Sequence, residues 1–112
     1  MKPSHGLTEK TIAQIAGVLA GFTDVERAIL FGSRAKGTHK RGSDIDLALI
    51  GRTLDQRTVG RIYDALDDLL LPYRFSLVIF DRNTDPDVAA HVKRVAIPFY
   101  ERETAAEELL RK

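Results

Sequence analysis

The chain has 112 residues, of which 44% are hydrophobic and 29% charged, so we expect one soluble globular domain over residues 1–112 with a modest core. A net charge of +1 gives no bulk field for nucleic acid or a membrane surface, and no apolar run reaches the ~20 residues of a membrane-spanning helix. The chain has no cysteine, which excludes disulfides and thiolate metal sites and agrees with a cytoplasmic protein.

The first half of the chain predicts one helix and two strands. Thr8 can cap a helix that runs to about Phe22, with an apolar stripe along one face. A strand follows from about Val25 to the apolar residues 29–31. A second strand covers 44–50, where a short alternating start leads into an apolar run.

The second half predicts two helices and two strands. A helix from about Leu54 to Leu71 should end at Pro72 and precede a strand over 74–80. Asp85 can cap a helix with Pro86 in its first turn, and 97–100 can form an edge strand, since Pro98 lacks a ladder donor. The expected buried residues of these two helices are Ile62, Leu66, Leu69, Leu70, Val88, Val92 and Val95.

The end of the chain predicts a short tail helix, in which Thr104 is the cap and Glu107 completes a capping box. Together the elements predict an α+β fold, an α/β sandwich. Its sheet should be small and mixed, with three to four strands and helices packed mainly on one face.

A glycine and a serine after the first strand suit phosphate binding. Gly32 lets the backbone turn without a Cβ clash, and Ser33 is a good helix N-cap. The chain can form one helical turn up to Gly37, which ends it. A strand that enters a helix through Gly-Ser presents backbone N–H groups and a hydroxyl to a phosphate. Taken alone, this dipeptide is equally an ordinary strand-to-helix turn.

Two aspartates open the second strand. Asp44 and Asp46 are residues i and i+2, so both side chains point to one face, roughly 6.6 Å apart along the strand. Two carboxylates that close repel each other unless a cation lies between them. Mg²⁺ prefers one or two carboxylates together with phosphate oxygens and water. Next to the Gly-Ser turn, the pair favours a site for a nucleoside triphosphate and a divalent metal over two solvated aspartates.

These motifs resemble a known family. Phe-Gly-Ser-Arg-Ala-Lys-Gly at 31–37 and Gly-Ser-Asp-Ile-Asp-Leu at 42–47 closely resemble the signature of the minimal nucleotidyltransferases, small members of the DNA polymerase beta-like superfamily. Residues 69–73, 91–94 and 99–102 look like later segments of that family, so the resemblance covers nearly the whole chain. It implies a nucleotidyltransferase fold that uses ATP and Mg²⁺.

The resemblance also implies which residues form the site. Gly32 and Ser33 would bind the triphosphate, with Arg34 and Ser43 beside them. Asp44 and Asp46 would bind Mg²⁺ and act in catalysis. The basic residues of this region, Arg34, Lys36, Lys40 and Arg41, can contact phosphates or an acidic partner, and a solvated basic loop is an equally good reading.

One position departs from the family. A third carboxylate would complete the metal site and help to activate the attacking hydroxyl, but Ser76 stands where the pattern has aspartate. Serine is a weak Mg²⁺ ligand and a poor base, and a positioned base typically contributes roughly 10²–10⁴-fold. Asp81 is the nearest acidic residue, five positions further along, so it should face the other side of the strand.

By analogy with the family, the partner is a small helical protein of the HEPN type, often an RNase toxin. Some minimal nucleotidyltransferases transfer AMP to a tyrosine of that toxin and silence it, so the resemblance implies an antitoxin. A catalytically impaired member that binds nucleotide or partner is the first alternative. Transfer to a small molecule is the second, and the absence of an acceptor domain in this sequence argues against it.

Other features predict less. We expect His39 and His91 to be exposed or structural, and the acidic cluster of the helix over 54–71 to lie on the surface. Apolar stripes on the helix after Thr8 and on the helix after Asp85 can form either core or an interface, so a homodimer stays open.

Overall fold

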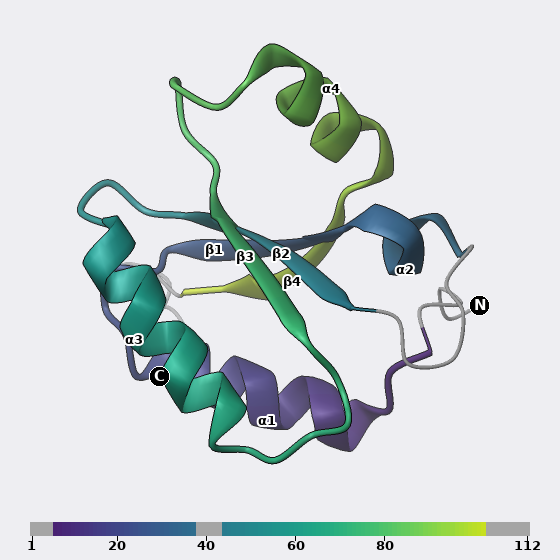
Figure 1. Cartoon of the computed structure of the whole chain (residues 1–112), viewed down its shortest axis with the longest axis vertical. Helices are drawn as coiled ribbons and strands as arrows, with labels where there is room; N and C mark the ends of the chain where they lie inside the picture. The colour runs from purple at the N-terminus through teal and green to yellow at the C-terminus, as the bar shows by residue number, and fades with distance from the viewer. Residues whose placement is uncertain (1–5, 38–43, 103–112) are drawn as a thin grey trace, which may run out of the picture.

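The computed structural model describes residues 6–37 and 44–102. Four helices and four strands follow one another along this part of the chain (Figure 1). Their bounds are α1 Glu9–Ala20, β1 Arg27–Phe31, α2 Gly32–Lys36, β2 Ile45–Ile50, α3 Gln56–Asp67, β3 Phe75–Ile79, α4 Pro86–Val95 and β4 Ile97–Glu101. The tail helix expected from Thr104 lies outside the described residues.

The four strands form one mixed sheet in the order β3-β2-β1-β4. β2 runs parallel to β3, whereas β1 pairs antiparallel with both β2 and β4. The expected mixed sheet of an α+β fold is therefore confirmed. β4 is an edge strand, as the proline at its second position predicts.

The core lies between the sheet and the two long helices. Alternate residues of β2 (Ile45, Leu47 and Leu49) are fully buried and pack in one cluster with apolar residues of α1 and α3. Figure 1 shows α1 and α3 together on one side of the sheet and α4 on the other. Most of the helical packing is thus on one face, and the second face is left to α2, α4 and the candidate site.

The expected caps at Thr8 and Asp85 are confirmed, and Asp55, which was not among the expected caps, caps α3. The side chains of Thr8, Asp55 and Asp85 accept backbone N–H groups at the starts of α1, α3 and α4. Gly37 ends α2 in the left-handed conformation at φ 76°. The expected N-cap at Ser33 is wrong, because the structure makes Phe31 the N-cap and puts Ser33 inside α2.

Two expected core residues are not buried. Leu70 is 89% exposed, because α3 ends at Asp67 and the chain then turns through a left-handed conformation at Leu70, with φ 55°. The apolar run therefore extends beyond the helix itself. Val88 is 39% exposed near the start of α4, while Val92 one turn later is buried.

Arg102 ties the end of the described chain to the end of α1. Its guanidinium donates to the carbonyl oxygens of Ala20, Phe22 and Val25 at 3.0, 3.1 and 3.2 Å. Ala20 is the last residue of α1 and the other two residues follow the helix, where helix-internal donors run out. The contact fixes β4 and β1 against α1. Within the described residues, no helix has both the length and the apolar character to cross a bilayer.

Candidate active site

The Gly32-Ser33 turn lies directly against Asp46. Gly32 has a positive φ of 76°, and a Cβ added there would overlap the Asp46 carboxylate and come within 2.9 Å of its Cγ. A glycine is therefore needed for the backbone conformation and for the close approach of the side chain. The structure brings the expected phosphate turn and one expected metal ligand into contact.

Asp46 lies in the middle of a row that crosses three strands. In the strand register, Phe31 of β1 pairs with Asp46 of β2, which in turn pairs with Ser76 of β3. Paired residues of neighbouring strands project to the same face. The Ser76 hydroxyl donates a hydrogen bond to the Asp46 carboxylate. Ser76 thus stands beside the metal-ligand candidate, where a third carboxylate would complete the site.

The pKa of Asp46 is raised above the ordinary carboxyl value of 3.8. Burial is the main cause, because removing water disfavours the charged form, and the neighbouring negative charge of Asp44 adds to it. The Ser76 hydrogen bond and the charges of His91 and Arg34 act in the opposite direction. Asp44 itself is exposed, just before β2 begins.

This donor set fits a divalent cation shared with a triphosphate. The half-buried Asp46 is harder to ionise beside the exposed, negatively charged Asp44, and a hard cation between the two carboxylates would relieve that cost. The described residues contain no group of three or more metal-ligating side chains. Phosphate oxygens and water would have to supply the remaining ligands, as they commonly do for Mg²⁺.

Arg34 is turned into the protein. It is 2% exposed, and its guanidinium carbon lies 4.8 Å from the centre of the Tyr73 ring. This cation–π contact joins α2 to the loop before β3. Its expected contact with the nucleotide stays a prediction, and the structure adds a packing role that the sequence did not reveal.

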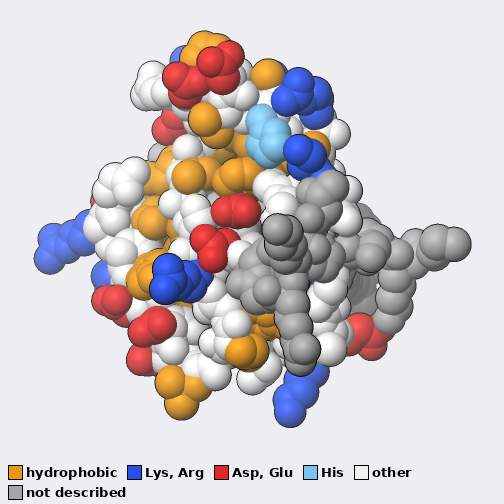
Figure 2. Space-filling model, turned by 45° about the vertical axis from the view of Figure 1, so that its right-hand side comes forward, with side chains coloured by type: hydrophobic (Ala, Val, Ile, Leu, Met, Phe, Trp, Pro, Cys, Tyr) orange, Lys and Arg blue, Asp and Glu red, His pale blue; other side chains and the backbone are white. Residues whose placement is uncertain are grey.

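The structure describes only some of the other candidate residues. Ser43, His39, Lys40 and Arg41 lie outside the described residues, while Lys36 is exposed at the end of α2. Asp81 belongs to the turn after β3, where its carboxylate accepts the Asn83 N–H at 2.8 Å. His91, which sequence reasoning treated as structural or surface, lies close enough for its charge to lower the pKa of Asp46. Figure 2 shows a histidine and acidic side chains on the same face, with apolar side chains between them.

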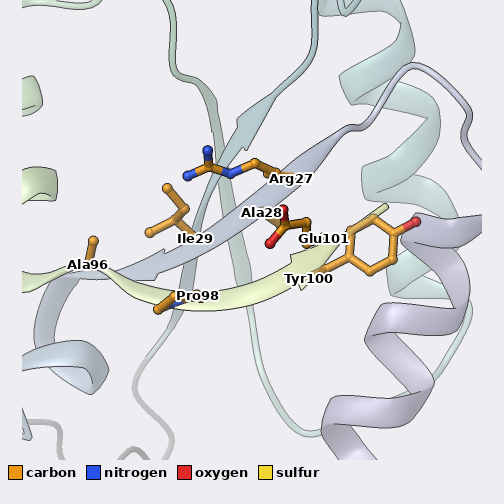
Figure 3. Close-up of a pocket in the computed structure, with 7 residues that line it drawn as sticks. All are labelled: Arg27, Ala28, Ile29, Ala96, Pro98, Tyr100 and Glu101. Carbon is orange, nitrogen blue, oxygen red and sulfur yellow. The ribbon is translucent and has the colours of Figure 1, made fainter. Parts of the chain in front are cut away.

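A pocket opens on the sheet at some distance from this row. Figure 3 shows its lining, which comes from β1, β4 and the end of α4. Its charged members are Arg27 and Glu101, which face each other across the two strands at the start of β1. Asp46 pairs with the other end of β1, so the pocket is separate from the candidate site.

The family model for the polymerase beta nucleotidyltransferase domain matches residues 13–105, a span that begins within α1 and includes every later element through β4. The chain belongs to this nucleotidyltransferase family. A relative from Haemophilus influenzae, named as the probable protein adenylyltransferase MntA, is 34% identical over 79 residues, which cover 70% of this chain and 68% of the relative.

Solved structures share the fold. One chain in a crystal structure of a toxin–antitoxin with AMP-PNP matches with a TM-score of 0.65 and 25% identity, over 92% of this chain and 80% of that chain. A structure of the tri-AMPylated HEPN toxin of Shewanella oneidensis with its MNT antitoxin matches with a TM-score of 0.64 and 20% identity, over 93% and 79%. The expected nucleotidyltransferase fold is confirmed.

Proposed function

We propose that this protein transfers AMP from ATP to a hydroxyl group of a helical HEPN-type partner protein and so acts as the antitoxin of a two-protein system. The observation that carries the proposal is the contact between the Gly32-Ser33 turn and Asp46, with Asp44 next to it. A phosphate turn that touches one of two neighbouring carboxylates suits a metal-bound triphosphate. ATP is an intracellular substrate, and we propose that the protein acts in the cytoplasm.

The relatives support the choice of reaction and partner. The Haemophilus influenzae relative is named as a protein adenylyltransferase, which gives a protein acceptor and an adenylyl donor. The structural neighbour at 25% identity is part of a toxin–antitoxin with an ATP analogue. The HEPN class of the partner follows from the family resemblance of the 31–47 segment, and self-association stays a prediction.

The residues would share the work as follows. Asp44 and Asp46 would hold Mg²⁺, which supplies charge neutralisation of the phosphates when it is bound. Gly32 and Ser33 would position the triphosphate. The acceptor oxygen forms a bond to the α-phosphorus, the bond to the bridging oxygen of the β-phosphate breaks, and pyrophosphate leaves with that electron pair. The hydroxyl proton passes to solvent, because Ser76 is a poor base.

The Ser76–Asp46 hydrogen bond favours a second candidate function. With serine at this position, the site lacks a positioned base. The neighbouring carboxylate of Asp46 has a raised pKa. Such a site can bind a metal-bound nucleotide and turn over slowly. The protein would then neutralise its partner by binding, and neutralisation would survive Asp44→Ala.

The test is the intact mass of the HEPN-type partner after incubation with this chain, Mg²⁺ and ATP. We expect one or more adenylyl groups on the partner, and none when EDTA replaces Mg²⁺ or when Asp44→Ala replaces the wild type. An unmodified partner that is still neutralised by the wild-type chain would refute AMP transfer and establish the binding function.

Gly32→Ala tests the contact that carries the proposal. The new Cβ would meet the Asp46 carboxylate at a backbone conformation that L residues rarely adopt, so the carboxylate must move. A displacement of about 1 Å at a reacting centre costs roughly 10²-fold in rate. Mass spectrometry of the partner over time measures this loss.

Gly60→Ala is the matched control for that variant. It makes the same chemical change in α3, where an added Cβ meets nothing within 4 Å and alanine is the better helix former. It should leave the transfer rate unchanged. Equal rates for Gly32→Ala and Gly60→Ala would show that the Gly32–Asp46 contact does not position the reaction.

A further inference from the structure

A histidine of α4 lies beside the candidate site and has no role in the chemistry above. The His91 ring meets the Phe31 ring edge-on, with centroids 6.2 Å apart and planes at 80°. Phe31 ends β1 immediately before the Gly32-Ser33 turn, and α4 packs against both α2 and β1. His91 therefore lies next to the turn, on the β1 side.

The imidazole is placed to meet a ligand of this site. His91 is half-buried, so its ring is held by packing but keeps part of its surface open. Its charge acts on the Asp46 carboxylate, which lies in the strand next to Phe31. A triphosphate held at the Gly32-Ser33 turn would lie next to Phe31, the residue on which His91 packs.

The strand order gives the site two distinct sides. β2 lies between β3 and β1, so Ser76 and Phe31 stand on opposite sides of Asp46 in one row. The family resemblance puts the base at the position of Ser76, and an acceptor hydroxyl activated from there would lie on the β3 side. Attack and departure are in line at the phosphorus, so the leaving group exits on the opposite side. That side is the one with Phe31 and His91.

We propose that His91 binds the leaving pyrophosphate by donating an imidazole N–H to an oxygen of the β- or γ-phosphate. This inference rests on the proposed nucleotidyl transfer and adds a residue to it. As the bond between the α-phosphorus and the bridging oxygen breaks, negative charge grows on the pyrophosphate. A donor fixed in advance by packing on Phe31 stabilises that charge, and imidazole offers an N–H in both its neutral and its charged form.

Two variants separate phosphate binding from packing. His91→Phe keeps an aromatic ring against Phe31 but removes the donor. His91→Gln keeps an N–H donor of similar reach but removes the ring. If His91 only supports Phe31, the glutamine variant should be the one that binds ATP and pyrophosphate less tightly. If His91 binds phosphate, the phenylalanine variant should be the one that does.

The measurement is the dissociation constant of ATP, pyrophosphate and AMP, each with Mg²⁺, by isothermal titration calorimetry. We expect His91→Phe to weaken ATP and pyrophosphate about tenfold or more, the typical effect of a lost charge-assisted hydrogen bond, and to leave AMP unchanged. His91→Gln should keep most of the affinity. Unchanged ATP binding by His91→Phe, an equal loss for AMP, or weaker binding by the glutamine variant would each overturn the inference.

This test is independent of the transfer assay. If the wild-type chain binds ATP but leaves the partner unmodified, AMP transfer fails while the two His91 variants still decide the phosphate contact. If the wild-type chain modifies the partner and His91→Phe matches it in every dissociation constant, the inference alone fails. A wild-type chain that binds neither ATP nor pyrophosphate would overturn both.

Discussion

Asp46→Asn is expected to abolish AMP transfer and, in the absence of metal, to make the folded protein more stable. The amide keeps the shape of the side chain and can still accept the Ser76 hydroxyl, but it loses the negative charge that would hold Mg²⁺. Metal-ion stabilisation of a phosphoryl transition state is worth several kcal/mol, so we expect a loss on the order of 10³-fold or more.

The gain in stability follows from the raised pKa of Asp46. Between the ordinary value of 3.8 and the higher folded-state pKa, the folded chain holds more protons than the unfolded chain, so stability falls as pH rises through that window. Above the window the ionised carboxylate opposes folding in full. Asn carries no charge and removes this cost at pH 7. The gain should be small, because Asp46 is only half-buried and solvent screens it.

Thermal melts with and without Mg²⁺, beside the transfer assay, measure both effects. Asp64→Asn is the matched control, since Asp64 is exposed on α3, on the other side of the sheet from the site. Mg²⁺ should raise the Tm of the wild type and of Asp64→Asn but not of Asp46→Asn. A transfer rate like that of the wild type in Asp46→Asn, or a lower Tm than the wild type at pH 7 without metal, would contradict the assignment.

The hydrophobic pattern explains how much of the fold the sequence predicts. Alternation and apolar runs correctly predict the strands, because a one-residue shift would move every buried side chain of β2 to the wrong face. The end of α3 was missed, because the apolar run 69–71 continues the helical pattern after the backbone has turned at Leu70. A hydrophobic pattern records which residues tend to be buried, and the backbone between them is set by tertiary packing.

The sequence likewise predicts only part of the candidate site. The Gly-Ser turn and the two aspartates are close in sequence, so their spacing alone indicates a shared site. His91 lies 45 positions beyond Asp46, on a helix that packs against α2 and β1. No local sequence pattern predicts this packing. The one sequence feature that marks His91 is its place before the buried Val92. The burial of Arg34 was also hidden, because it depends on a stacking partner, Tyr73, from a distant loop.

Ser76→Asp is expected to raise the rate of AMP transfer by about 10²–10⁴-fold, the usual contribution of a positioned base. Ser76 pairs with Asp46 between the parallel strands β2 and β3, so an aspartate there would point to the same face and complete a three-carboxylate site. It could take the acceptor proton directly instead of leaving it to solvent. It should also tighten Mg²⁺ binding, since the new carboxylate adds a negatively charged oxygen ligand.

The gain in transfer rate should come with a loss of stability that the wild type avoids. Without metal, a third carboxylate beside Asp46 would repel it, raise the pKa of Asp46 further and lower the Tm at pH 7. Ser76→Asn is the control, because it adds similar volume without charge and should neither accelerate transfer nor bind Mg²⁺ more tightly than the wild type. If Ser76→Asp transfers AMP no faster than Ser76→Asn, position 76 is not where the base acts. If only Ser76→Asp modifies the partner, the serine has turned a nucleotidyltransferase site into a binding site.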